Sequence, residues 1–311
     1  MTPIVSKETL YNSSITMNVI SREESINPKE VKLLTYSGPK DTCQGIESGK
    51  LGNMAGGFHF QLFGEKWYSS EHLYLCGEWS TSSDKDMEIQ KYIRKMPSGD
   101  YAKRCSKAKY KDDIRQDFVS FRHHWMLWCV WQKCVLNQNF STLLKSVPED
   151  MVIVEMVKDA PVWAAYPDEN GIMRGANGMG KILTICRRCL IEGTQPEIDT
   201  DLLNNANIYI LSKRLRFLNK DERAEFINNA IYEFRGGMAR KFYFTNEDYP
   251  FIPYYYDPID DCLHADDVSV PFHFKEEDIT KGVILRSLEA LNDALIEYFQ
   301  KNKGITLYEY D

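Results

Sequence analysis

Glu71 is the acidic residue best placed to do chemistry, because it lies in a segment typical of a capped helix start, Trp67–His72. Ser69 or Ser70 can cap the helix that follows, and Glu71 then occupies its first turn. The positive end of the helix dipole favours a carboxylate at that place. The segment therefore indicates an enzyme pocket with Glu71 as its acid.

A second segment with chemical potential lies later in the chain, at Gly175–Lys181. Its glycines leave backbone N–H groups unshielded, which is a common way to approach a phosphate or a ribose closely, and Lys181, Arg187 and Arg188 follow on the predicted helix. Neither a Walker nor a Rossmann pattern surrounds it. An ordinary connection from loop to helix is therefore the alternative interpretation.

The elements that must position these segments are mainly helical. The strongest helical pattern covers residues 111–137, where apolar and aromatic residues recur at spacings of three and four. Its tryptophans could form a stacking platform for a base, but core packing is the preferred interpretation. The other predicted elements are a hairpin over 58–67, a buried strand over 151–155, and helices over 86–95, 98–108, 178–192 and 280–301.

Composition narrows the class of protein. The 311 residues are 43% hydrophobic and 13% aromatic, which supports a globular fold with a buried core. The net charge of -7 argues against a surface that coats nucleic acid, although a local basic strip over 103–115 is an alternative to a plain solvated helix face. The eight cysteines are scattered and indicate reduced thiols. The single CxxC, Cys186–Cys189, lacks a second ligand pair, so no metal site is predicted.

The chain is expected to be cytoplasmic and to have no membrane partner, since no stretch has the apolar length of a signal core or a spanning helix. The predicted fold class is mainly α with some β. We expect three parts: an N-terminal lead-in over 1–45, a core over 46–195, and an α+β extension over 196–311 that packs on the core or forms a small lobe.

Residues 51–190 resemble the NADAR family, the YbiA-like N-glycosidases, through five motifs in the family's order. They are Leu51-Gly52-Asn53-Met54, Gly64–His72 with Glu71 at the family's acid, Arg115–Phe118 with Trp125, Met126 and Lys133 at the expected offsets, Glu155 with Trp163, and Gly175–Gly180 followed by Leu183 and Arg187.

The resemblance implies a mainly helical core with a few short strands that cleaves an N-glycosidic bond. Its substrate would be ADP-ribosylated guanine in DNA or a phosphorylated intermediate of the riboflavin pathway. The chain departs from the family pattern at four positions. Glu78 replaces a lysine, Phe118 replaces a tryptophan, and Ala164 replaces a glycine. The acid that the family has before the tryptophan at Trp163 is Asp159 here, one position earlier than in the family pattern.

The expected catalytic residues are carboxylates, because glycosidic cleavage passes through a cationic, oxocarbenium-like sugar. Glu71 is expected to stabilise that charge, with Asp159 as the acid/base and Glu78 or Lys103 in reserve. On one helix Glu71 and Glu78 would lie about 10 Å apart on nearly the same side. An exposed helix position is the plain alternative for Glu78.

A set of polar, aromatic and glycine positions completes the predicted site. The residues expected to bind the ligand are Asn53, Trp67, Lys103, Arg115, Phe118, Glu155, Trp163, Gly175, Asn177 and Gly180. Core packing for the tryptophans and turn formation for the asparagines are the alternatives. His72 is expected to pack or cap, while His123 and His124 face different sides of their helix and make no metal site.

The resemblance implies an enzyme without a cofactor. The expected partners are ADP-ribose, ADP-ribosylated DNA and, as a functional opponent, a DarT-type DNA ADP-ribosyltransferase toxin, which would make the chain an antitoxin. The alternatives are the riboflavin-pathway hydrolase and a non-catalytic protein that binds ADP-ribose.

Overall fold

The computed structural model describes residues 24–62, 65–217, 219, 241–245, 250–257, 262–265, 274–275 and 306–309. The chain divides into two compact units, Met1–Phe217 with Tyr308–Asp311, and Leu218–Leu307. The predicted mainly helical α+β class is confirmed for the described residues. The helix predicted over 280–301 and the turn at Gly64 lie outside them.

Helices dominate the first unit. They are α2 (Ser70–Cys76), α3 (Asp84–Arg94), α4 (Gly99–Tyr110), α5 (Phe118–Leu136), α6 (Gln138–Lys145), α7 (Gly178–Glu192) and α8 (Thr200–Asn205), with short 3-10 turns η1 (Ser48–Leu51), η2 (Gly77–Trp79) and η3 (Lys111–Asp113). In the residues described, no helix combines the length and apolar character that a membrane crossing requires.

Short strands accompany the helices. In the first unit they are β1 (Ser25–Ile26), β2 (Lys32–Tyr36), β3 (Phe60–Leu62), β4 (Glu65–Trp67), β5 (Met151–Glu155), β6 (Tyr166–Pro167), β7 (Met173–Arg174), β8 (Tyr209–Ile210) and β9 (Lys213–Phe217). The strand β14 (Thr306–Glu309) forms a sheet with β9 and β8. In the second unit β10 (Lys241–Thr245), β11 (Pro250–Asp257), β12 (Cys262–Ala265) and β13 (Phe274–Lys275) form an antiparallel sheet in that order.

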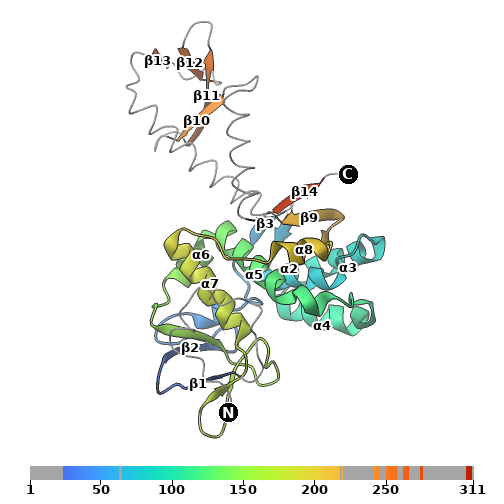
Figure 1. The fold of residues 1–311 in the computed structure, drawn as a ribbon, viewed down its shortest axis with the longest axis vertical. Coiled ribbons are helices and arrows are strands. Elements are labelled where there is room, and N and C mark those ends of the chain that lie inside the picture. The colour runs from blue at the N-terminus through green and yellow to red at the C-terminus, as the bar shows by residue number, and fades with distance from the viewer. Residues whose placement is uncertain are drawn as a thin grey trace. The chain divides into compact units, whose positions relative to one another are not determined.

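The central element of the first unit is α5, which contacts α2, α6, α7 and α8 (Figure 1). Every residue from His124 to Cys134 is buried, so its apolar pattern serves packing on all sides, and Trp125 stacks on Trp128 at 4.8 Å between ring centroids. The predicted start at residue 111 was wrong. Extended backbone at Ile114 interrupts the pattern, and α5 begins at Phe118.

The site is framed by the short helix α2 and the parallel strand pair β2–β5. The predicted hairpin forms from β3 and β4 and leads into α2, which begins at Ser70 as expected. The strand β2 comes from the predicted lead-in and pairs with β5, placing Tyr36 opposite Glu155. In addition, α8, β8 and β9 of the predicted extension belong to the same compact unit. The three-part division of the chain stays a prediction.

Candidate active site

Glu71 is held at the start of α2 by the loop around Asn53. The Asn53 side-chain amide donates to Glu71 Oε2, and the Glu71 backbone N–H donates to the Asn53 carbonyl oxygen at 3.1 Å. Ser69 is the N-cap but makes no side-chain cap bond, because its hydroxyl is hydrogen-bonded to His72 Nδ1 at 2.8 Å. Asn53 therefore fixes the carboxylate that the helix start places in the interior.

The environment of Glu71 makes it a group that can exchange protons near neutral pH. Glu71 is only 1% exposed, and burial raises the pKa of its carboxyl group from 4.5 to about 7. The positive charge of Lys103 works against this rise, while the negative charges of Glu78 and Glu155 add to it. A carboxyl group with such a pKa can act as an acid or as a base.

Glu78 lies in η2, directly after α2, rather than on an exposed helix face. The residue is 4% exposed, its carboxylate forms an ion pair with Lys107 of α4, and its backbone oxygen accepts from the Arg115 N–H at 3.0 Å. Burial raises its pKa, and Lys107 and Lys103 counteract that rise. The exposed alternative for Glu78 was wrong.

Glu155 ends β5 and is the third carboxyl of this region. Burial raises its pKa to about 7, and Lys103 opposes the shift. Its backbone N–H donates to Asn177 Oδ1 at 3.2 Å, which fixes the end of the strand. We call Glu71, Glu78, Glu155, Lys103 and Lys107 the carboxyl cluster, since these charges influence one another.

Trp163 packs near three residues that the sequence interpretation did not include, Tyr74, His123 and Arg122. Its ring lies 5.8 Å from the Tyr74 ring and 5.0 Å from the His123 ring, and the Arg122 guanidinium carbon is 5.9 Å from it. Tyr74 has a raised pKa, first through burial and then through Glu78 and Glu71. The sequence signal that could have pointed to Arg122 is its spacing, because it follows the predicted ligand residue Phe118 by four residues, one helical turn.

Three predicted ligand residues make extensive internal contacts. Trp67 is 0% exposed and donates to the Leu62 carbonyl oxygen at 3.0 Å. Arg115 binds the Asp117 carboxylate with two nitrogens, each at 2.7 Å, and also binds Ser80 and the Ala206 carbonyl. The Phe118 ring packs on Tyr74 and Phe121. Their roles in ligand binding stay predictions.

The glycine-rich segment Gly175–Lys181 is also engaged internally. Gly175 has a φ of 128° and lies against the Ala164 carbonyl, and a Cβ at Gly180 would lie 2.0 Å from the Ile153 carbonyl oxygen. Asn177 donates to that same oxygen at 2.8 Å, and Lys181 forms an ion pair with Glu24. These contacts attach α7 to β5 and account for the residue types without a ligand.

Asp159, whose catalytic role stays a prediction, lies outside the buried interior. It is exposed, in the turn after β5, and makes no hydrogen bond or ion pair with the residues described. Lys103 is also exposed, but its charge lowers the pKa values of Glu71, Glu78 and Glu155.

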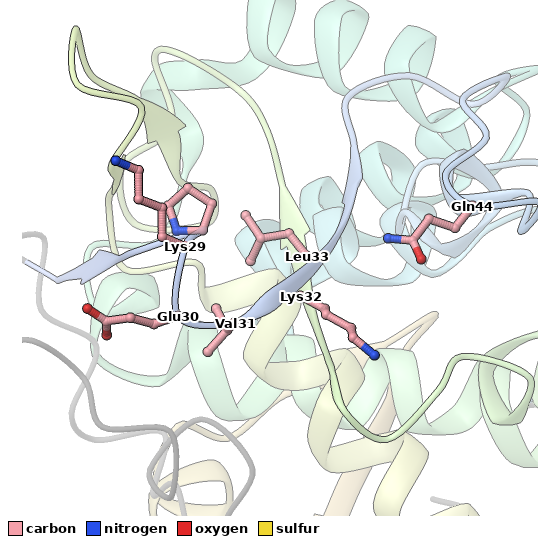
Figure 2. Close-up of a pocket in the computed structure, with 7 residues that line it drawn as sticks. Lys29, Glu30, Val31, Lys32, Leu33 and Gln44 are labelled. Atoms are coloured by element: carbon pink, nitrogen blue, oxygen red, sulfur yellow. The ribbon is translucent and has the colours of Figure 1, made fainter.

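No set of three or more His, Cys, Asp or Glu side chains among the described residues could hold a metal ion. An open hollow of about 450 Å³ lies elsewhere, lined by Pro28–Leu33 and Gln44 (Figure 2). It includes Lys32, which pairs with Met151 at the start of β5, whereas Glu155 lies at the other end of that strand. The hollow is therefore separate from the carboxyl cluster.

Comparison with known proteins gives one structural similarity. No protein-family model and no curated protein matches the chain. The NMR structure of the E. coli protein YbiA aligns with 52% of this chain and 86% of its own length, at 20% sequence identity and a TM-score of 0.40. At this TM-score we draw nothing about activity from the similarity.

Proposed function

We propose that this chain is an N-glycosidase that removes ADP-ribose from ADP-ribosylated guanine bases in DNA and so opposes a DarT-type DNA ADP-ribosyltransferase. The observation that supports this most is the pair of carboxyl groups of Glu71 and Glu155, each with a pKa near 7. Because both groups have a pKa near 7, each can be present in either protonation state at neutral pH, and the proposal assigns the ionised form to Glu71 and the protonated form to Glu155. The substrate follows from the resemblance of the five sequence motifs to the NADAR family.

The two protonation states divide the work of glycosidic hydrolysis. Ionised Glu71 stabilises the positive charge that develops at C1 of the ribose as the bond to the guanine nitrogen breaks. Protonated Glu155 supplies a proton to that nitrogen. A water molecule then adds its oxygen to C1 and returns its proton to a carboxylate, which releases free ADP-ribose and the restored base.

Glu155 takes the role of acid that the sequence interpretation gave to Asp159. A catalytic acid needs a raised pKa and proximity to its partner, and Glu155 has both, because burial raises its pKa and its charge acts on Glu71. Asp159 is exposed. This assignment keeps the role predicted for Glu71, stabilisation of the positive charge on the sugar.

Lys107 compensates for the lysine that the family pattern has at position 78. Its ammonium group reaches the Glu78 carboxylate from α4, a different helix. A lysine charge is thereby delivered to the same neighbourhood by another part of the chain. This arrangement favours an enzyme over the non-catalytic ADP-ribose-binding alternative that the Glu78 substitution suggests.

The decisive experiment measures release of free ADP-ribose from an oligonucleotide that carries one ADP-ribosylated guanine. Chromatography with mass detection follows both products for the intact chain, for Glu71→Gln and for Glu155→Gln. Glu169→Gln is the matched control, because Glu169 is exposed in the turn between β6 and β7. A phosphorylated riboflavin-pathway intermediate is tested in parallel.

We expect the intact chain and the control to release ADP-ribose, and Glu71→Gln to be slower by about 10²-fold or more. Cleavage of the riboflavin intermediate alone would move the chain to that substrate class. If neither substrate is cleaved by the intact chain, the enzyme proposal is wrong and a binding protein remains.

A further inference from the structure

Arg122 has an uncommitted guanidinium group at the border of the carboxyl cluster. It is half-buried on α5, and it forms no hydrogen bond or ion pair with any residue that the structure describes. Its Nε is buried and lacks a partner. The guanidinium carbon is 5.9 Å from the centroid of the Trp163 ring. Five N–H donors therefore stand beside the candidate site with few acceptors.

The neighbouring His123 adds a second unpartnered group. Its ring lies 5.0 Å from that of Trp163, and its Nε2 is buried without a hydrogen-bond partner. Burial lowers the pKa of His123 to about 4, and the charge of Arg122 adds to this effect. The imidazole is thus neutral at physiological pH and can donate one N–H.

Other arginines of the same unit show what a structural role looks like. Arg115 binds a carboxylate with two nitrogens. Arg94 also has a buried Nε without a partner, but its terminal nitrogen binds Glu65 at 2.5 Å, and Arg122 differs by having no such carboxylate. Arg122 acts on the pKa of Glu78, but the Glu78 carboxylate is already paired with Lys107. The guanidinium of Arg122 is therefore available for an anion that comes from outside the chain.

We propose that Arg122 and His123, which both lie near the Trp163 ring, bind a phosphate group of the ligand, and that in ADP-ribose this group belongs to the diphosphate. The identity of the ligand rests on the proposed function. The anion site itself rests only on the unpartnered donors and on their common neighbour Trp163. It explains why two costly unsatisfied groups occur side by side.

The test is a calorimetric titration of the 311-residue chain with three probes: ADP-ribose, inorganic pyrophosphate, and adenosine, which has no phosphate. Each probe is titrated into the intact chain, Arg122→Gln, Arg122→Lys and the control Arg104→Gln. Arg104 is exposed on α4 and already paired with Asp100 at 3.0 Å. Thermal unfolding is measured for every variant.

We expect Arg122→Gln to bind ADP-ribose and pyrophosphate at least about tenfold more weakly, with Arg122→Lys intermediate and Arg104→Gln unchanged. Adenosine affinity should not change in any variant. The unfolding temperature of Arg122→Gln should change little, because the variant loses the ring contact with Trp163 but no hydrogen bond or ion pair with the described residues. A purely structural arginine would instead lower it.

Two results overturn the anion site: equal affinity of Arg122→Gln and the intact chain for both phosphate probes, or no binding of either probe by the intact chain. The proposed function fails differently, through the absence of ADP-ribose release from DNA. Binding of pyrophosphate that depends on Arg122, without such release, would keep the anion site and remove the glycosidase.

Discussion

The carboxyl cluster and the glycine-rich segment differ in how completely their polar groups are satisfied within the protein. In Gly175–Lys181 both amide atoms of Asn177 bind the β5 backbone, and the Lys181 ammonium is paired with Glu24. At the cluster, the Glu155 carboxylate accepts no hydrogen bond from the described residues, and neighbouring Arg122 and His123 have unpartnered nitrogens. The polar groups of the glycine-rich segment are therefore satisfied within the protein, whereas groups at and beside the carboxyl cluster remain available to a ligand.

This difference has a simple energetic consequence. Satisfied groups contribute to folding, so their removal should cost stability and little chemistry. Buried carboxyl groups with raised pKa values oppose folding when ionised, so their removal should cost chemistry and little or no stability. Substitutions in the glycine-rich segment are therefore expected to change stability and not activity. Substitutions in the carboxyl cluster are expected to change activity with little loss of stability.

The largest expected effect is that of Gly180→Ala in the glycine-rich segment. The added Cβ would lie 2.0 Å from the Ile153 carbonyl oxygen, so α7 must move away from β5. We expect the free energy of unfolding to fall by about 3 kcal/mol in urea denaturation. Gly56→Ala is the matched control, because nothing lies within 4 Å of its added Cβ. Equal stability of the two variants would contradict the tight helix–strand contact.

The next effect concerns Glu71 and the pH dependence of stability. Because its pKa is raised from 4.5 in the unfolded chain to about 7 in the fold, the folded state binds more protons between these values. The free energy of unfolding should therefore fall as pH rises from 4.5 to above 7, by roughly 3 kcal/mol from this group.

Urea denaturation at pH 5, 6, 7 and 8 measures this dependence. Glu71→Gln should flatten the profile and be more stable than the intact chain at pH 8. Glu169→Gln should keep the original slope, since its side chain is exposed. A Glu71→Gln profile parallel to that of the intact chain would show that the carboxyl group does not have the raised pKa.

The part of the site that could be predicted from sequence is the part encoded locally. A serine before an apolar periodic run predicts the start of α2, and Glu71 follows from it. The ion pair of Lys107 with Glu78 and the group around Trp163 arise from packing between elements far apart in the chain. No local pattern contains them.

In the glycine-rich segment a local pattern is present, but it is compatible with two different uses. A glycine admits a phosphate or a neighbouring backbone for the same reason, the missing Cβ. Sequence spacing alone could not separate these uses. The 2.0 Å approach of Ile153 at Gly180 identifies close packing as a sufficient reason.

Asn177 is the residue that connects the two regions, and its replacement should have the smallest effect. Its side chain holds the Glu155 N–H and the Ile153 carbonyl, and its backbone adopts a left-handed φ of 48°. Asn177→Ala loses both bonds and strains the backbone, so we expect a loss of about 2 kcal/mol in urea denaturation. Asn177→Gly loses the same bonds without the Cβ strain and should be less destabilised.

Because both variants release the Glu155 backbone, both should also reduce ADP-ribose release per folded molecule to a similar extent. Unequal stability with equal loss of activity would separate the packing role of Asn177 from its positioning role. Full activity in both variants would mean that the end of β5 stays in place without Asn177. The two regions would then be independent, and the position of Glu155 would depend on the β2–β5 pairing and on the hydrogen bond that the Ala165 N–H donates to the Glu155 carbonyl oxygen at 2.9 Å.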